Sequence, residues 1–500
     1  MTKKSRATNL PYRVLFNQDC DHVFYATQEP FEPRHVDEMV DRIAQGGADV
    51  LLVNPSAQLA YYPSKVWQTA WDGFVPGRRE FFGPIPDDQV PERERALCQM
   101  KRLVDQGCDY LARALARCRA DGIVPGVSVR MNDMHDAPWK GSHFHSRFYT
   151  EHPEYQLSYP STRGWSGTAL NYEHAAVREH HLTLIRELAQ DYDVEVLELD
   201  FLRFTRYVPS DGDLARKAAT MTGFVREVRA ILRGTGRAIA FIPRVAATPA
   251  AALELGFDVA AWAREGLVDG VTVGHFLSTG WNMAVEQFRE RIGSETGLYV
   301  CTDASADRRD GLPTRLLPVD ADLLRGFAAA YLASGADGIA LFNFFALDPT
   351  DPPPLYATLR QLSSLDGLRG QPKTYLITAG TSACETDAPV QVPVAMAHNQ
   401  SREFEIRLAA EPAHMQAELR VILEGATSAD QLWLHFDAAP LGHALAIEDG
   451  PTGQRRARTA QFDVPIQSLR DGLNRLVLRN QGHPLTVLGI EVHVQPAGLA

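Results

Sequence analysis

Residues 196–204, VLELDFLRF, form an apolar run that also carries two acids and a base. Side chains of a β-strand alternate between its two faces. One face of this run holds Leu197, Leu199 and Phe201. Glu198 and Asp200 share the other face. The pattern predicts a strand with helices packed on its apolar side and a polar, functional space on its acidic side.

Eight strand-like runs alternate with amphipathic, helix-like stretches between about residues 12 and 365. Such alternation is typical of an α/β fold with a parallel sheet covered by helices. Eight units favour a (β/α)8 TIM barrel over a doubly wound sheet. No GxGxxG or GxxxxGK[ST] loop follows any run, which disfavours a nucleotide-binding protein. The predicted strands are 12–17, 48–54, 123–132, 194–200, 238–244, 269–275, 298–303 and 338–344.

The helical periodicity disappears after about residue 370, and short alternating segments separated by Gly, Asn, Asp and Pro follow. This pattern is typical of an antiparallel β-sandwich, and we expect a jelly-roll-like one. We therefore predict a catalytic barrel domain over residues 1–370 and an accessory sandwich domain over residues 371–500. The sandwich is expected to bind carbohydrate, to pack on the barrel or to mediate homo-oligomerisation.

Composition and charge restrict the class of protein. Acids outnumber bases by 62 to 50, and the net charge of −12 argues against a nucleic-acid or anionic membrane partner. No apolar run has the length of a membrane helix, and the first residues lack the apolar core of a signal peptide. Six cysteines without a CxxC motif indicate reduced thiols. We expect a cytoplasmic protein with no organic cofactor.

Polar side chains tend to end the predicted strands. In a barrel these ends converge on one rim, where active sites lie. The loops over residues 54–92 and 133–171 are long and rich in aromatic residues, which is typical of functional loops. The polar strand ends are Asn17, Asn54, Asn132 with Asp133, Asp200, Arg244, His275, Asp303 and Asn343.

Asp200 is the leading candidate for a catalytic carboxylate. Burying an unpaired carboxylate is costly, and Glu198 one layer deeper adds to that cost. Two neighbouring acids raise the pKa of one of them, which suits a general acid. The alternative for Asp200 is a helix cap or an ion pair with Arg203. The alternative for Glu198 is a buried pair with Arg130 or Arg203.

Residues 170–204, LNYEHAAVREHHLTLIRELAQDYDVEVLELDFLRF, resemble the glycosyl-hydrolase-like TIM-barrel families related to family 10. The matching positions are Val177-Arg178, Tyr192-Asp193-Val194 and Leu199-Asp200-Phe201-Leu202-Arg203. SVRMNDMHD (128–136) and GFDVAAWAREGLVDGVTVGHF (256–276) are similar to further segments of these families. One departure is Glu195-Val196, where the families have Asp-Gly. The resemblance covers most of residues 12–365 and implies a barrel that acts on glycosidic bonds.

Glycoside hydrolysis requires two carboxyl groups, roughly 5 Å apart for retention of configuration and roughly 6.5–9.5 Å apart for inversion. In several glycosidase barrels one carboxylate comes from the fourth strand and its partner from a later strand. Asp303, at the end of the run LYVCTD, is the first candidate for the partner of Asp200. Asp133 is its rival. A helix cap or a turn is the alternative role for Asp303.

Substrate-binding candidates surround these acids. Arg130 and Asn132 share one strand face and can bind sugar hydroxyls or a carboxylate, or Arg130 can neutralise Glu198 or Asp200. Arg203 and Arg244 have the same two alternatives, and three arginines near one rim raise the hypothesis of an acidic sugar. The remaining candidates are Asn17, Asp19, His275, Asn343 and, for stacking on a sugar ring, Trp139 and Trp281.

The sequence thus predicts a glycoside hydrolase acting on a small oligosaccharide or glycoside. We expect no metal site, because the HxH pair His143 and His145 lies inside a loop and a metal site also needs further ligands at compatible positions. One alternative is a metal-dependent sugar isomerase, epimerase or lyase on the same barrel. The other is a non-catalytic barrel that binds carbohydrate.

Overall fold

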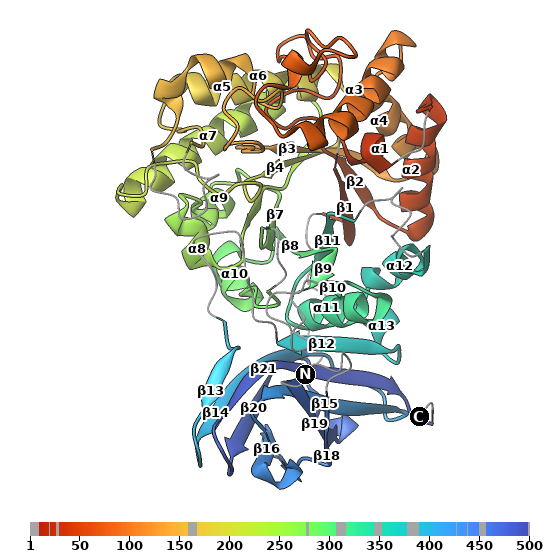
Figure 1. The fold of residues 1–500 in the computed structure, drawn as a ribbon, viewed down its shortest axis with the longest axis vertical. Coiled ribbons are helices and arrows are strands. Elements are labelled where there is room, and N and C mark those ends of the chain that lie inside the picture. Colours follow the sequence, from red (N-terminus) through yellow and green to blue (C-terminus); the bar gives the residue numbers. More distant parts are fainter. Residues whose placement is uncertain are drawn as a thin grey trace.

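The computed structural model contains a closed barrel and two antiparallel sheets (Figure 1). The barrel occupies the upper part of the view and the sheets the lower part, with β12 (Lys373–Ile377) beneath helix α11 (Ala321–Ala333). The structure describes residues 10–19, 21–26, 30–158, 168–276, 280–306, 317–344, 353–377, 390–426, 428–437, 439–449 and 457–498.

Eight parallel strand positions form the barrel, which closes because β3 pairs with β4 as well as with β2. The fifth position is divided between two short strands that both pair with β4. Each predicted run overlaps an observed strand, so the (β/α)8 prediction is confirmed. The strands are β1 Val14–Gln18, β2 Val50–Val53, β3 Val124–Arg130, β4 Val196–Asp200, β5 Ala240–Phe241 with β6 Arg244–Ala246, β7 Gly270–Gly274, β8 Gly297–Asp303 and β11 Gly338–Phe342.

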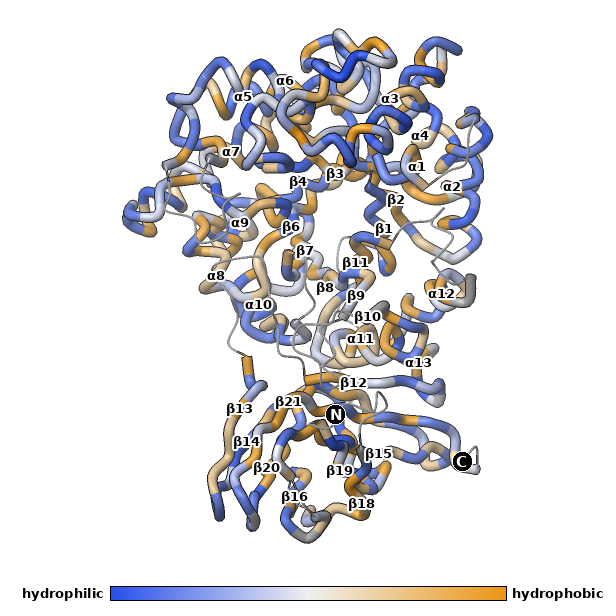
Figure 2. Tube along the Cα trace, viewed as in Figure 1, coloured by the Kyte–Doolittle hydropathy of each residue, from blue (hydrophilic) through white to orange (hydrophobic). Residues whose placement is uncertain are grey.

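Helices cover the outside of the barrel, and the strands beneath them are largely hydrophobic (Figure 2). Phe201, just after β4, stacks on Phe257 with 4.8 Å between ring centroids, and Leu197 and Leu199 join the same core. The helices, besides α11, are α1 His22–Ala26, α2 Pro33–Gly46, α3 Val90–Asp105, α4 Tyr110–Asp121, α5 Arg147–Glu151, α6 Ala175–Asp191, α7 Leu214–Gly234, α8 Pro249–Glu254, α9 Val259–Arg264, α10 Val285–Ile292, α12 Pro353–Thr358 and α13 Leu365–Leu368.

A smaller apolar cluster lies inside the barrel, with Val196 as the contribution of β4. Alternation then places Glu198 one layer higher and Asp200 at the top of the strand. The predicted division of β4 into an apolar outer face and an acidic inner face is therefore confirmed. The other members of the cluster are Leu10, Leu15, Val50, Leu52, Ile242, Tyr299, Cys301, Ala340 and Phe342.

The C-terminal region forms two antiparallel sheets, as predicted. One sheet has the order β12-β21-β15-β19-β18 with β13 also paired to β21, and the other has the order β14-β20-β16-β17. The strands are β13 Val394–Met396, β14 Ser401–Leu408, β15 Met415–Glu424, β16 Leu432–Phe436, β17 Ala439–His443, β18 Ala446–Asp449, β19 Ala457–Val464, β20 Gly472–Asn480 and β21 Leu485–Pro496. A short ribbon of β9 (Ser305–Ala306) and β10 (Leu317–Pro318) follows β8.

The barrel and the sandwich meet where α11 packs on β12. A Cβ atom added to Gly326 of α11 would lie 1.9 Å from the carbonyl oxygen of Thr374 in β12, so only glycine fits this approach. Arg407 of β14 also binds Glu286 of α10 at 2.7 Å. The helix that follows the β9–β10 ribbon is thereby held by the second domain.

Gly326→Ala should therefore lower the free energy of unfolding by about 1–3 kcal/mol, because the helix must move away from β12. Urea unfolding followed by circular dichroism measures this change. Gly223→Ala in α7 is the matched control, because a Cβ there meets no atom within 4 Å. The free energy of unfolding of Gly223→Ala should be higher than that of the wild type by about 0.5–1 kcal/mol. Equal stability of the two variants would contradict the proposed contact.

Candidate active site

Asp200 lies inside the barrel and is bound by Arg244. Nη1 of Arg244 donates to both carboxylate oxygens of Asp200, each at 2.9 Å. The backbone N–H groups of Leu202 and Arg203 donate to Oδ1 at 2.9 and 3.1 Å. Both side chains of the ion pair are at most 2% exposed. The alternative of an ion pair with Arg203 is not observed: Arg244 makes the ion pair, and Arg203 contributes its backbone N–H.

Besides Asp200, residues at the ends of two further barrel strands hold Arg244. Its guanidinium lies 3.9 Å from the ring centroid of Phe342, at the end of β11. Its Nη2 donates to the carbonyl oxygen of His275 at 2.8 Å. A buried ion pair needs such additional contacts, because desolvation of both charges opposes it. Asp200 and Arg244 therefore form a buried ion pair beneath the barrel mouth, held by several contacts.

Glu198 accepts hydrogen bonds instead of pairing with an arginine. Asn17 Nδ2 and Ser128 Oγ donate to its Oε1 at 2.9 and 2.7 Å. Burial, and then the charge of Asp200, raises the pKa of Glu198 to about 7, against the opposing effects of Arg244, Ser128 and Asn17. The alternative role of Glu198, a buried pair with Arg130 or Arg203, is not observed. The predicted upward pKa shift within the two-acid strand falls on Glu198.

Asp303 ends β8 and is more exposed than either acid of β4. Asn343 Nδ2 donates to its Oδ2 at 3.1 Å, from a backbone with a φ of 58°. Asparagine tolerates this left-handed conformation better than most residues. Burial raises the pKa of Asp303 to about 6, although Arg244 and Asn343 oppose the shift. Asp303 is thus a partly exposed carboxyl group that exchanges a proton close to neutrality.

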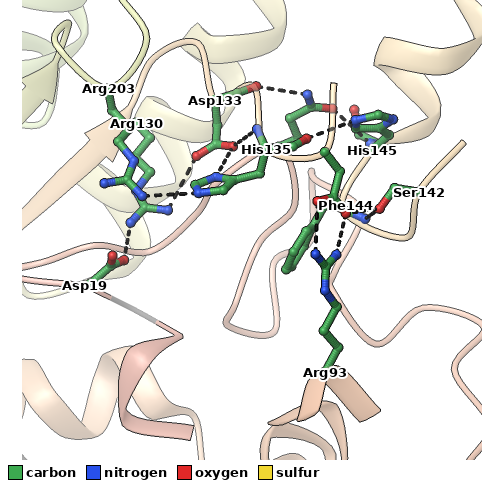
Figure 3. Close-up of polar contacts among 12 residues, drawn as sticks. Asp19, Arg93, Arg130, Asp133, His135, Ser142, Phe144, His145 and Arg203 are labelled. Atoms are coloured by element: carbon green, nitrogen blue, oxygen red, sulfur yellow. Dashed lines mark hydrogen bonds and ion pairs between the residues drawn. The ribbon is translucent and has the colours of Figure 1, made fainter. Parts of the chain in front are cut away.

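A second polar cluster lies on the β1 and β3 side of the mouth (Figure 3). Arg130 binds Asp19 and also Asp133, the latter with 3.4 Å between Nη1 and Oδ2. The Oδ1 atom of Asp133 lies 2.7 Å from Nδ1 of His135. Burial would raise the pKa of Asp133, but His135, Arg130 and Arg203 together lower it. Asp133 is therefore suited to hold a positive charge, and Arg130 does not neutralise Glu198 or Asp200.

Two further candidates hold loops at the barrel mouth: Asn132 joins two loops, and His275 makes a contact within one. Asn132 Nδ2 donates to the carbonyl oxygens of Leu170, at 2.9 Å, and of Arg206. His275 Nε2 lies 2.7 Å from Asn282 Oδ1, and burial lowers the pKa of His275 to about 4. These contacts fix the loops after β3, β4 and β7 around the mouth.

The predicted tryptophans lie in different surroundings. Trp139 is half-buried, with the guanidinium of Arg93 5.9 Å from its ring centroid. Trp281 is 9% exposed and packs edge-on against Phe327 of α11, at 5.3 Å. Trp281 thus contacts the helix between β8 and β11, and stacking of either ring on a sugar stays a prediction.

Sequence reasoning missed two residues of this region. Ser128 bonds Glu198, and its position two residues before Arg130 on the inner face of β3 is a signal that alternation offers. His135 lies in the loop after β3 and contacts both Asp133 and Arg203. Its position in the chain carries no periodic signal, so only the folded loop reveals its role.

The loop histidines His143 and His145 are buried, and burial lowers the pKa of His143 to about 4. Within the described ranges, no three or more His, Cys, Asp or Glu side chains are grouped to hold a metal ion. Among the helices that the structure describes, none is both long and apolar enough to span a membrane.

Solved structures of similar fold include three enzymes of glycoside chemistry. α-L-fucosidase isoenzyme 2 from Paenibacillus thiaminolyticus is 10% identical, with a TM-score of 0.46 over 71% of this chain and 49% of that one, so the chain spans about half of the fucosidase. The PgaB (BpsB) glycoside hydrolase domain from Bordetella bronchiseptica is 13% identical, with a TM-score of 0.45 over 71% and 99%. An Anoxybacillus α-amylase is 10% identical, with a TM-score of 0.41 over 94% and 98%.

No protein-family model and no curated protein matches the sequence. The similarity to the three solved structures is low, so the fold assignment rests on the strand pairing itself. By that pairing, the chain is a (β/α)8 barrel protein with a C-terminal antiparallel sandwich.

Proposed function

We propose that the chain is a glycoside hydrolase whose active site is the mouth of the barrel. One observation carries the proposal: Asp200 and Asp303 end the fourth and seventh barrel strands, and Arg244 acts on both in different ways. Arg244 forms a buried ion pair with Asp200. It acts on Asp303 only through space, and burial dominates the pKa of that acid. Two carboxyl groups in unlike environments are what two-carboxylate hydrolysis requires.

In this mechanism Asp303 is the general acid. Its pKa of about 6 leaves part of the population protonated near neutral pH, so it can protonate the glycosidic oxygen as the bond to the leaving group breaks. Asp303 is also the more exposed of the two acids, so it is placed to touch the substrate. The substrate is proposed to be a small oligosaccharide or glycoside.

Asp200 supplies the second negative charge. Its carboxylate is held by Arg244 and by two backbone N–H groups, so it is fixed in place before the substrate binds. The transition state of glycoside hydrolysis carries positive charge on the sugar ring, and a fixed carboxylate stabilises that charge. A water molecule then adds to the anomeric carbon, and the proton that it releases returns to Asp303. Glu198 lies one layer below Asp200 on the same strand. Because its pKa is raised to about 7, Glu198 is largely protonated at pH 6 and adds little negative charge to the barrel interior.

Purified protein comprising residues 1–500 should release nitrophenol from at least one 4-nitrophenyl glycoside in a panel of α- and β-linked hexosides, pentosides and uronides. The assay is run at about pH 6, near the pKa of Asp303. The rate should be unchanged by EDTA. Loss of the activity with EDTA and its return with a divalent cation would favour the metal-dependent alternative. Saturable sugar binding without cleavage of any panel member would favour the carbohydrate-binding alternative.

A further inference from the structure

Arg203 is a buried guanidinium that forms no ion pair with any residue the structure describes. The residue is 7% exposed, and its Nε atom is buried without a hydrogen-bond partner. Its one hydrogen-bond contact among the described residues joins Nη2 to Nε2 of His135 at 3.3 Å. Buried polar groups are almost always satisfied, and a buried unpaired charge is especially costly. The buried guanidinium of Arg203, which has no carboxylate partner among the described residues, therefore points to a ligand.

The neighbouring arginines differ from Arg203 in having carboxylate partners, although Nε of Arg244 is also buried without a hydrogen-bond partner. Arg130 binds Asp19 and Asp133, and Arg244 binds Asp200. The acids nearest to Arg203 are thus engaged with other cations. Asp21 is also near, but burial and the charge of Asp19 raise its pKa, which weakens it as a counter-ion. Of the three mouth arginines, Arg203 alone has no carboxylate partner within the described part of the chain.

The guanidinium of Arg203 reaches over the mouth of the barrel. Although Arg203 follows β4, its guanidinium lies 5.8 Å from the ring of Phe276, after β7, and 5.8 Å from the ring of Phe342, on β11. Figure 3 shows it beside the guanidinium of Arg130 and next to His135. Its charge also acts on Asp303, the proposed general acid. A group bound by Arg203 would therefore lie within the proposed active site.

We propose that Arg203, with His135 beside it, binds the carboxylate of an acidic sugar, so that the substrate is a glycoside of a uronic acid. This inference rests on the proposed function, because it assigns the substrate class of the same site. The planar guanidinium fork matches a carboxylate with two parallel hydrogen bonds. One carboxylate also brings the single negative charge that one unmatched arginine requires. Asp133 holds His135 through Nδ1, and Nε2 of His135 contacts the guanidinium of Arg203.

Isothermal titration calorimetry with D-glucuronate and D-glucose, and with D-galacturonate and D-galactose, tests the inference. The members of each pair differ only in a carboxylate or a hydroxymethyl group. Wild-type protein should bind at least one uronate roughly tenfold or more tightly than its neutral partner, as expected for charge-assisted hydrogen bonds. Arg203→Met should abolish this preference, and Arg203→Lys should keep part of it. Arg226→Met, at a surface pair with Glu265, should keep the full preference.

Equal binding of both members of both sugar pairs by the wild-type protein would overturn the inference, whatever the fold of the variants. A uronate preference that survives in folded Arg203→Met would overturn it as well. The proposed function can fail separately. If the protein cleaves neutral glycosides and shows no uronate preference, the proposed hydrolase function is supported and the proposed uronic acid substrate is contradicted. Uronate binding that depends on Arg203, with no glycoside cleaved, supports the anion site and contradicts the hydrolase.

Discussion

Asp303→Asn should lower kcat/KM for a cleaved glycoside by about 10²–10⁴-fold, the usual contribution of a general acid. Asparagine has nearly the same shape and can still accept the hydrogen bond from Asn343, so the loss would come from the missing proton. Steady-state kinetics on the best substrate of the panel measures it. Asp366→Asn, which changes a side chain that is 95% exposed, should leave kcat/KM unchanged.

The pH dependence of the hydrolysis rate also tests the role of Asp303 as general acid. The pKa of Asp303 is raised to about 6, so the acid is protonated below that pH and loses its proton above it. The wild-type rate should fall as pH rises through 6, and the residual rate of Asp303→Asn should not show that fall. Between about pH 4 and 6 the unfolded state gives up this proton while the folded state still holds it, so the folded state loses stability as the pH rises through that window.

Asp303→Asn should therefore be at least as stable as the wild type at pH 7, because asparagine removes the buried charge. A variant that keeps wild-type kcat/KM would contradict the assignment of Asp303. So would a loss of activity that is matched by a loss of stability, since the effect would then be structural. Thermal unfolding of both proteins at pH 7 separates these outcomes.

Asp200→Asn should lower the free energy of unfolding by about 3–5 kcal/mol, because it leaves Arg244 charged and uncompensated in the barrel interior. Arg244→Met should cost a similar amount, because it leaves Asp200 without its cation. Urea unfolding at pH 7 measures both variants. These are the largest stability effects that we expect from single changes in the site.

The double variant Asp200→Asn with Arg244→Met is the control for this pair. Removing both charges avoids an unpaired ion, so the double variant should be more stable than the sum of the single effects implies. It should nevertheless be inactive, because the fixed carboxylate is lost. Additive single effects, or a cost below about 1 kcal/mol for each, would show that the pair does not act as a buried unit.

The sequence by itself determined the scaffold and the direction of its side chains. Alternation in VLELD separates Leu197 and Leu199 from Glu198 and Asp200, because a strand has a period of two. Eight such runs between amphipathic helices leave few arrangements other than a barrel. The polar residues at the strand ends, including Asp303 and Arg244, follow from the same local periodicity. These features depend on neighbours in the chain, so they are readable before folding.

Only the tertiary structure decided which charges meet. Arg203 is three residues from Asp200 in sequence, yet Arg244 of the next barrel strand binds that acid. Arg130 lies directly across from Asp200 in the β3–β4 register, yet it binds Asp19 and Asp133. Closure of the barrel brings residues from distant strands onto one rim, and desolvation there makes each pairing depend on ångström-scale geometry. That closure leaves Asp303 with its raised pKa and Arg203 without a partner carboxylate among the described residues.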